Sequence, residues 1–412
     1  MRCLRIVITF TAIAVAIPLM SFTPAALPDP IAEWSLAAQA AVVAAGMPAL
    51  RTPITFAILH LAMYDAANAV TRDHQPYAVA PKVPHPASTV AAATEAGYRI
   101  LLAEVPSQKA ALDNVYHRLR ASMPETQETI NGIAAGAAVA EELLLRRAHD
   151  GRNATIPYAP GSGRGAWIAT PPGFMPATTA FLAQVTPFTM ESPSQFRPGG
   201  PPPFHSRQWI RDYDEVKTLG AKDSSSRTPE QTMTALFWEP LAGTVWPATI
   251  RRLAQEQQLD LSSSARFQAA AFAAFADGLI ACWDAKFYFN YWRPVTAIRD
   301  GDTDENESTV ADPNWEPLAI TPNFPEYPSG HACATAAVAH TIEDFFPHDV
   351  IIPARNVMSG EERFFRKARD IVDEVVEARM LLGLHFRSAD EDGAEIGRKI
   401  ARQIRSRWFK RD

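Results

Sequence analysis

The stretch SSSARFQAAAFAAFADGLIACWDAKFYFNYW, residues 262–292, decides the fold class of this 412-residue chain. It is long, rich in alanine and poor in β-branched residues, which predicts a buried helix. Similar helical patterns recur on both sides, and no segment alternates with period two over the length of a strand. The sequence therefore predicts an all-α fold, with helices expected at Ile31–Ala45, Ile54–Val70, Ala87–Val105, Gln108–Met123, Thr126–His149, Trp209–Leu219, Pro229–Trp238, Pro247–Glu256, Ser262–Trp292, Ala332–Phe346 and Glu361–Leu382.

Composition divides the chain into four parts. Residues 1–26 have a basic start, a short apolar run and a small-residue end, as in a secretory signal, so we expect an exported protein, periplasmic or secreted. The alternative is an uncleaved anchor, but the apolar run is short of the roughly 20 residues of a bilayer span, and we expect none in the mature chain. An amino-terminal helical region at 27–150, a Gly/Pro-rich crossing at 151–206 and a helical catalytic domain at 207–412 follow, which predicts two packed helical halves.

Charge and cysteine content argue against two further classes of protein, those that bind nucleic acid and those built on a disulfide framework. Without Arg2 and Arg5 of the signal, 37 basic residues stand against 45 acidic ones, a net charge of −8, which argues against a nucleic-acid partner. Cys282 and Cys333 are the only cysteines after the signal, so a disulfide framework is excluded. We interpret them as two buried thiols, although a single bridge between them is the alternative.

The end of the central helix carries two cations. Trp283, Lys286, Asn290 and Arg293 are spaced by three, four and three residues, which predicts one helical face with Lys286 and Arg293 about two turns, roughly 10 Å, apart. Pro294 disfavours α geometry at Arg293, so the helix should end there and free this guanidinium to reach into a cleft. The alternative is an amphipathic helix with solvated basic residues.

Two further stretches suggest an anion site. Ser329, Gly330 and His331 follow a Pro-rich segment and precede an Ala-rich one, which places them at a helix amino terminus, where backbone N–H groups and the helix dipole favour an anion. His331 would stand beside that anion with a pKa near the working pH. Arg379 and His385 flank Gly383 later in the chain. Taken singly, these residues could equally be a helix cap, a surface histidine and a structural pair.

Together, the spacings Lys-x6-Arg-Pro, Pro-Ser-Gly-His and Arg-x5-His resemble the signature of the superfamily of type 2 phosphatidic acid phosphatases and vanadium-dependent haloperoxidases. The segments WDAKFYFNYWRPVTAIRDGD and FPEYPSGHA look more like the vanadium chloroperoxidase branch. In that branch the positions of Trp283 and Phe324 line the halide side. The segment RTPITFAILHLAMYDAANAV is similar to the helical region that precedes the catalytic part in secreted bacterial members.

The resemblance implies a vanadate cofactor, with hydrogen peroxide and a halide as small-molecule partners. His385 would bind vanadium, and Lys286, Arg293, Ser329, Gly330 and Arg379 would hold the oxyanion. His331 would take a proton from peroxide, and Lys286 would polarise the peroxide so that halide leaves as a hypohalous species.

Two alternatives use the same residues. In a phosphatase, His385 would attack phosphorus to form a phosphohistidine and His331 would protonate the leaving oxygen. A periplasmic anion-binding protein would leave the paired histidines unexplained. The phosphatase pattern also places an Asp four residues after the second histidine, whereas here that position is Ala389 and the acid is Asp390, which leaves open the group that orients His385.

Overall fold

The computed structural model of the chain describes residues 29–240, 242–346 and 350–411 and confirms the all-α class. These residues form thirteen α-helices, three short 3-10 helices and one two-stranded antiparallel sheet. The elements are α1 (Pro30–Ala44), α2 (Thr52–Thr71), α3 (Thr89–Glu104), η1 (Pro106–Gln108), α4 (Lys109–Ala121), α5 (Gln127–Arg146), η2 (Ala180–Gln184), α6 (Arg207–Leu219), α7 (Pro229–Phe237), α8 (Ala242–Glu256), α9 (Leu261–Phe289), α10 (Pro294–Arg299), η3 (Gly301–Asp304), α11 (Gly330–Phe345), β1 (Ile352–Arg355), β2 (Glu362–Phe365), α12 (Ala368–Leu381) and α13 (Arg387–Arg407).

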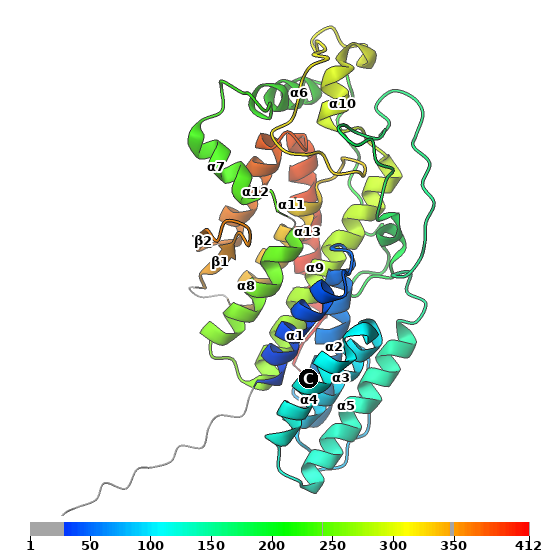
Figure 1. Ribbon diagram of the computed structural model, residues 1–412, viewed down its shortest axis with the longest axis vertical. Coiled ribbons are helices and arrows are strands. Elements are labelled where there is room, and N and C mark those ends of the chain that lie inside the picture. Colours follow the sequence, from blue (N-terminus) through cyan, green and yellow to red (C-terminus); the bar gives the residue numbers. More distant parts are fainter. Residues whose placement is uncertain (1–28, 241, 347–349, 412) are drawn as a thin grey trace, which may run out of the picture.

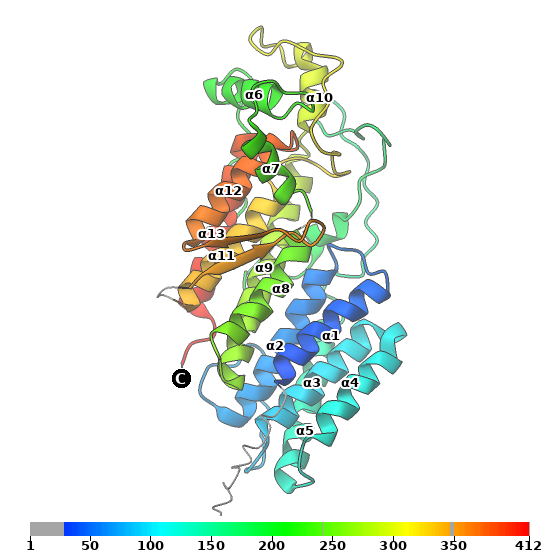
Figure 2. The ribbon, with the colours of Figure 1, turned by 60° about the vertical axis from the view of Figure 1, so that its left-hand side comes forward.

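The central helix α9 joins two groups of helices. The amino-terminal helices α1 to α5 lie together toward one end of the elongated molecule, and most helices after the crossing lie toward the other, whereas α8 and α9 extend alongside α1 and α2 (Figure 1). Figure 2 shows α2 and α8 running close to α9 from a second direction. One hydrophobic cluster includes Leu59 of α2, Phe272 of α9 and Val338 of α11, all fully buried. The two halves therefore share a core.

The Gly/Pro-rich crossing is irregular, as its composition predicts, and η2 is the one helical turn in it. It runs as a long coil along the side of the molecule (Figure 1). Two of its residues hold the end of α9: the Tyr158 hydroxyl donates to Asn290, and Thr179 Oγ1 accepts a 2.9 Å hydrogen bond from the Trp283 indole. The crossing therefore fixes side chains close to the predicted site.

Two predicted helix starts are wrong. Asp260, not Ser262, is the N-cap of α9, because its carboxylate accepts the backbone N–H of Ser263 at 2.7 Å and so satisfies an amide of the first turn. Pro247 does not begin α8 but lies inside it. Pro229, by contrast, begins α7 behind a capping box formed by Thr228 and Gln231.

The sequence prediction also missed two strands and two helices. The hairpin of β1 and β2 occupies the predicted linker and the first residues of the helix predicted at 361–382. The helices α10 and α13 were not predicted. The α13 segment contains Gly393 and Gly397, which weaken a helical pattern. Their role is packing: a Cβ on Gly397 would come within 2.5 Å of the Cys333 carbonyl oxygen on α11. The glycines therefore let α13 approach α11 closely.

Burial also bears on the cysteines and the apolar helices. Cys282 and Cys333 are free and buried, as the thiol interpretation predicts. In the part of the chain that the structure describes, α2 and α9 are long and apolar enough to cross a membrane, but 89% and 94% of their most apolar windows are buried inside the protein, as in core helices. The predicted signal at residues 1–26 lies outside the described residues.

Candidate active site

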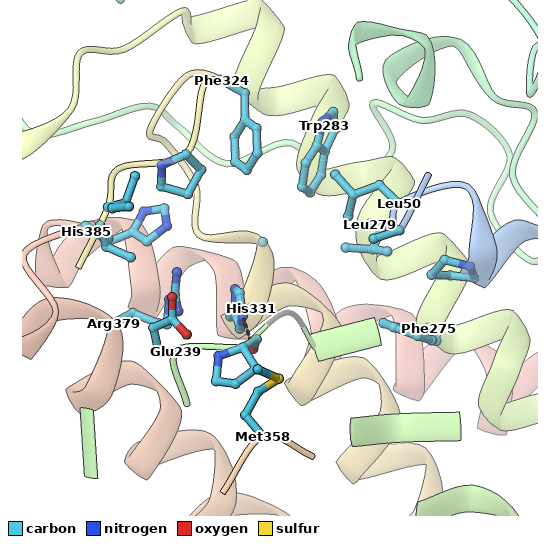
Figure 3. A pocket seen from close by; sticks show the side chains of 17 residues that line it. Leu50, Glu239, Phe275, Leu279, Trp283, Phe324, His331, Met358, Arg379 and His385 are labelled. Carbon is cyan, nitrogen blue, oxygen red and sulfur yellow. Dashed lines mark hydrogen bonds between the residues drawn. The ribbon is translucent and has the colours of Figure 1, made fainter. Parts of the chain in front are cut away.

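A cavity of about 340 Å³ opens where the two helical halves meet. Its polar lining includes His331, Arg379 and His385, and Trp283 and Phe324 lie across from them (Figure 3). The amino-terminal half also contributes to the wall, through the connection between α1 and α2. The remaining lining residues are Ala49, Leu50, Pro53, Glu239, Pro240, Phe275, Leu279, Ile320, Pro322, Gly330, Met358 and Leu384.

The end of α9 and the loop after it supply the first cations. Lys286 is fully buried on α9, but the helix ends at Phe289 with Asn290 in a left-handed conformation. The predicted single face is therefore wrong for Asn290 and Arg293. Arg293 nevertheless enters the site from extended backbone as the N-cap of α10, where Pro294 begins the next helix.

The Lys286 ammonium group is engaged with the backbone. Its Nζ donates to the carbonyl oxygens of Pro325 at 3.1 Å and Glu326 at 2.7 Å, and also to that of Pro328. It therefore holds the loop that leads into α11, and it lies behind the cavity wall rather than in it. Burial lowers the pKa of Lys286 to about 8, and the nearby Arg293 acts in the same direction.

The predicted helix amino terminus is present. Ser329 is the N-cap of α11, yet its side chain makes no capping hydrogen bond, and Gly330 begins the helix. A Cβ on Gly330 would meet the Trp283 ring at 2.9 Å, so glycine is needed for this close approach. His331 follows on the first turn and lines the cavity.

Arg379 and His385 come from the end of α12 and the loop after it. Gly383, with φ of +74°, turns the chain between them in a conformation that favours glycine. Arg379 is 2% exposed, and its Nη1 donates to the carbonyl oxygen of Trp238 at 3.0 Å. The fold thus brings the predicted site residues together: Lys286, Arg293, Arg379, His331, His385 and the Ser329–Gly330 turn.

Glu326, which the sequence prediction missed, lies against His385. Its fully buried Oε1 is 2.9 Å from His385 Nδ1 and accepts the backbone N–H of Phe386 at 3.1 Å. Glu326 belongs to the FPEYPSGH segment, which is distant from His385 in the sequence. The contact forms only in the fold, so the sequence alone gave no indication of it. Glu326 is therefore the carboxyl group that orients His385.

These contacts also fix the tautomer of His385. Arg293 Nη1 lies 3.3 Å from His385 Nε2, and a guanidinium can only donate, so Nε2 is the acceptor. The proton of the neutral ring must then be on Nδ1, where it is donated to Glu326. Burial, followed by the charges of Arg293 and Lys286, holds the pKa of His385 well below its usual range. His385 is a neutral imidazole with its Nε2 lone pair directed at the cations.

His331 is also neutral. Its Nε2 lies 3.1 Å from the Pro240 carbonyl oxygen, which can only accept, so Nε2 carries the proton and Nδ1 the lone pair. Burial and then the charge of Arg379 lower its pKa well below the usual value. The expectation of a pKa near the working pH is therefore wrong, because His331 is half-buried at the cavity wall beside the cations.

The site has a surplus of positive charge. Burial raises the pKa of Glu326 to about 8, against the opposing effect of Lys286 and Arg293, so its carboxyl group is mostly neutral at pH 7. Arg293 Nη2 and Arg379 Nε, both in this site, are among the buried N–H donors of the described residues that have no hydrogen-bond partner. Unpaired buried donors on cations are costly, and an oxyanion would satisfy them.

Asp390 does not take the orienting role. It lies in the first turn of α13, fully buried, and neither of its carboxyl oxygens has a hydrogen-bond partner among the described residues, so it does not contact His385 in this way. Burial raises its pKa well above the usual range, although Ser329 opposes this shift. Asp390 is therefore a buried carboxyl group near the start of α11 and is not the group that orients His385.

A second carboxylate, Glu239, lines the cavity itself. It is exposed, and Figure 3 shows it beside Arg379. No pattern in the sequence distinguishes Glu239 from other surface acids. The described residues contain no group of three or more His, Cys, Asp or Glu side chains placed to hold a metal ion.

The part of the chain that carries the site resembles known proteins. The family model described as "VCPO second helical-bundle domain" matches residues 266–410, which contain every predicted site residue. Residues 266–410 are therefore similar to that helical bundle. The vanadium chloroperoxidase of Curvularia inaequalis is 32% identical over 148 aligned residues, which cover 31% of this chain. That match spans only 24% of the length of the curated relative.

Solved structures extend the likeness of the fold beyond the bundle. A bacterial vanadium-dependent iodoperoxidase has a TM-score of 0.77 at 22% identity, covering 93% of this chain and 97% of its own. An apo-type bacterial vanadium-dependent chloroperoxidase has a TM-score of 0.67 at 18% identity, covering 87% and 94%. Both helical halves of this chain therefore have counterparts in haloperoxidase folds.

Proposed function

We propose that this chain is a vanadate-dependent haloperoxidase, which oxidises a halide with hydrogen peroxide to a hypohalous species. The observation that carries the proposal is the set of unpartnered donors on Arg293 and Arg379 beside the neutral His385, inside a bundle of this family's type. An oxyanion fits this donor set, and a neutral imidazole is the ligand form of histidine.

The proposed roles follow from the contacts. Arg293 and Arg379 would hold the oxyanion's oxygens with planar donor groups, and the amide of Gly330 and the hydroxyl of Ser329 would add donors at the start of α11. His385 Nε2 would bind vanadium, held in place through Nδ1 by Glu326. When bound, vanadate would act as a Lewis acid that activates peroxide toward the halide.

Two further residues would complete the chemistry. The unprotonated Nδ1 of His331 would take the proton of incoming hydrogen peroxide, because Nε2–H is already donated to Pro240. Lys286 would act through the loop that it holds, with its charge lowering the cost of negative charge nearby. This differs from direct contact of Lys286 with the peroxide.

Trp283 and Phe324 would form the halide side. Their ring centroids are 5.1 Å apart, and the indole N–H is already donated to Thr179, so the pair presents an apolar wall to the cavity. A weakly hydrated halide would lie against this wall with the cationic side opposite. Hydrogen peroxide and the halide are then the protein's small-molecule partners, and no nucleic acid is involved.

The rival function is a phosphatase with a phosphohistidine at His385, because the same donors would hold phosphate. The test measures bromide-dependent halogenation of a reporter dione with peroxide, with and without vanadate, beside hydrolysis of a nitrophenyl phosphate. We expect vanadate-dependent halogenation that His385→Ala abolishes. His340→Ala, which changes a histidine of α11 outside the cavity, is the matched control. Phosphate hydrolysis without halogenation would overturn the proposal in favour of the rival.

We also propose that the protein is exported, to the periplasm or beyond, with residues 1–26 as its signal. The support is the order of basic, apolar and small residues in that segment. Sequencing the amino terminus of the protein from the exported fraction tests this. A mature chain that begins close to residue 27 is expected, and an intact Met1 in that fraction would contradict it.

A further inference from the structure

A methionine lies at the mouth of the cavity on the loop between β1 and β2. Met358 is 82% exposed and lines the cavity. Figure 3 shows it on the same side as His331 and Glu239. Among the described residues that line the cavity, it is the only one with a sulfur atom.

Hydrogen bonds hold this loop over the cavity. The Oδ1 of the buried Asn356 accepts the backbone N–H of Met358 at 2.8 Å and that of Ser359 at 3.0 Å. Asn356 Nδ2 donates to the Phe237 carbonyl oxygen at 3.0 Å, at the end of α7. The loop is thus tied to the segment that leads to the cavity wall.

The same segment is tied to the proposed chemistry. Its Trp238 carbonyl accepts from Arg379 at 3.0 Å, and its Pro240 carbonyl faces His331 Nε2 at 3.1 Å. Met358 is therefore placed relative to Arg379 and His331 by the hydrogen bonds of Asn356 and by the backbone of residues 237–240.

We propose that Met358 is a site of oxidation during turnover, modified by the hypohalous acid formed in the cavity. The inference rests on the proposed function, which supplies the oxidant. The thioether sulfur attacks the halogen, and hydroxide leaves. Water then adds to the sulfur, and halide and protons leave. Overall, the thioether and hypohalous acid give the sulfoxide, halide and one proton, with two electrons passing from sulfur to halogen. The product places a polar S=O group on an apolar rim.

The experiment compares methionine sulfoxide at three positions by peptide mass spectrometry after turnover with vanadate, peroxide and bromide. Met175 and Met233 are the internal controls, because they are 58% and 56% exposed and lie outside the cavity lining. A parallel sample receives hypobromite from outside, without turnover. A His385→Ala sample with all reagents measures direct oxidation by peroxide.

We expect the ratio of Met358 to Met233 oxidation during turnover to exceed the ratio with added hypobromite by on the order of tenfold, because the oxidant forms beside this sulfur. Equal ratios, with dione bromination intact, would overturn the inference and leave the proposed function standing. An excess at Met358 that persists in His385→Ala would also overturn it, since peroxide alone would then be the oxidant. Loss of bromination in the unmodified protein would overturn both, and the dione assay reports this separately.

Discussion

Replacing Glu326 should weaken oxyanion binding by removing the acceptor that holds His385. In Glu326→Leu the Nδ1–H of His385 and the N–H of Phe386 both lose their acceptor in a buried place. An unsatisfied buried donor costs about 1–3 kcal/mol, so we expect a clear loss of stability. Replacing a residue that hydrogen-bonds a metal-binding histidine lowers metal affinity by about 10- to 100-fold, which corresponds to roughly 1.4–2.8 kcal/mol.

The variant Glu326→Gln separates the effect of the hydrogen-bond acceptor on vanadate affinity from the effect of the carboxylate charge. Because burial raises the pKa of Glu326 to about 8, its carboxyl group at pH 7 acts mainly as a neutral acceptor. Glutamine keeps an oxygen acceptor, so vanadate affinity at pH 7 should stay within about threefold of the unmodified protein. The exposed Glu316, which pairs with Lys222 at the surface, provides a matched control in Glu316→Leu.

The assay is calorimetric titration of vanadate into each purified protein at pH 7, with thermal unfolding of the ligand-free proteins alongside. The order of affinity should be unmodified protein, then Glu326→Gln, then Glu326→Leu. Unchanged affinity in Glu326→Leu would refute the orienting role. Equal loss in both variants would refute the neutral carboxyl group, since negative charge would then be what matters.

Three further perturbations test other parts of the structure. Oxyanion affinity should fall as pH rises through about 8, because Lys286 loses its proton and Glu326 gains a negative charge, and titrations at pH 7 and 9 should show a smaller fall in Glu326→Gln. Burial lowers the pKa of His60 to about 3 in the folded protein. The protein therefore loses folding stability as the pH falls below 6.5, the pKa of this histidine in the unfolded chain. Urea unfolding should show that His60→Leu removes about 2 kcal/mol of the stability difference between pH 7 and pH 5, and an unchanged difference would contradict this. Gly330→Ala brings a Cβ to 2.9 Å from an indole carbon and should cost about 1–3 kcal/mol in thermal unfolding, whereas Gly199→Ala, with no atom within 4 Å, should not.

Local signals in the sequence predicted most of the helices and the parts of the site that depend on them. The run 262–292 is helical for nearly all its length, because alanine and unbranched residues favour the helix and the core buries it. The Pro-rich segment before Ser329 and the Ala-rich one after it set the start of α11. These signals act over a few residues, so spacing alone reveals them.

The remaining features depend on contacts between distant segments. Glu326 reaches His385 across 59 residues, and Leu50 joins the cavity from the amino-terminal half. Arg293 keeps its place in the site although the predicted helical face fails, because Lys286 and Arg293 both bind carbonyls of the loop at 324–328. No single-sequence periodicity encodes such pairings, since they form only when the elements pack.

Titration of vanadate into the metal-free protein, followed by dione bromination with peroxide, tests the central proposal most directly. The structure predicts that activity rises with added vanadate, saturates at one vanadate per chain, and is lost in His385→Ala while His340→Ala keeps it. Bromination that does not depend on vanadate, or vanadate binding that is unchanged in His385→Ala, would contradict the account.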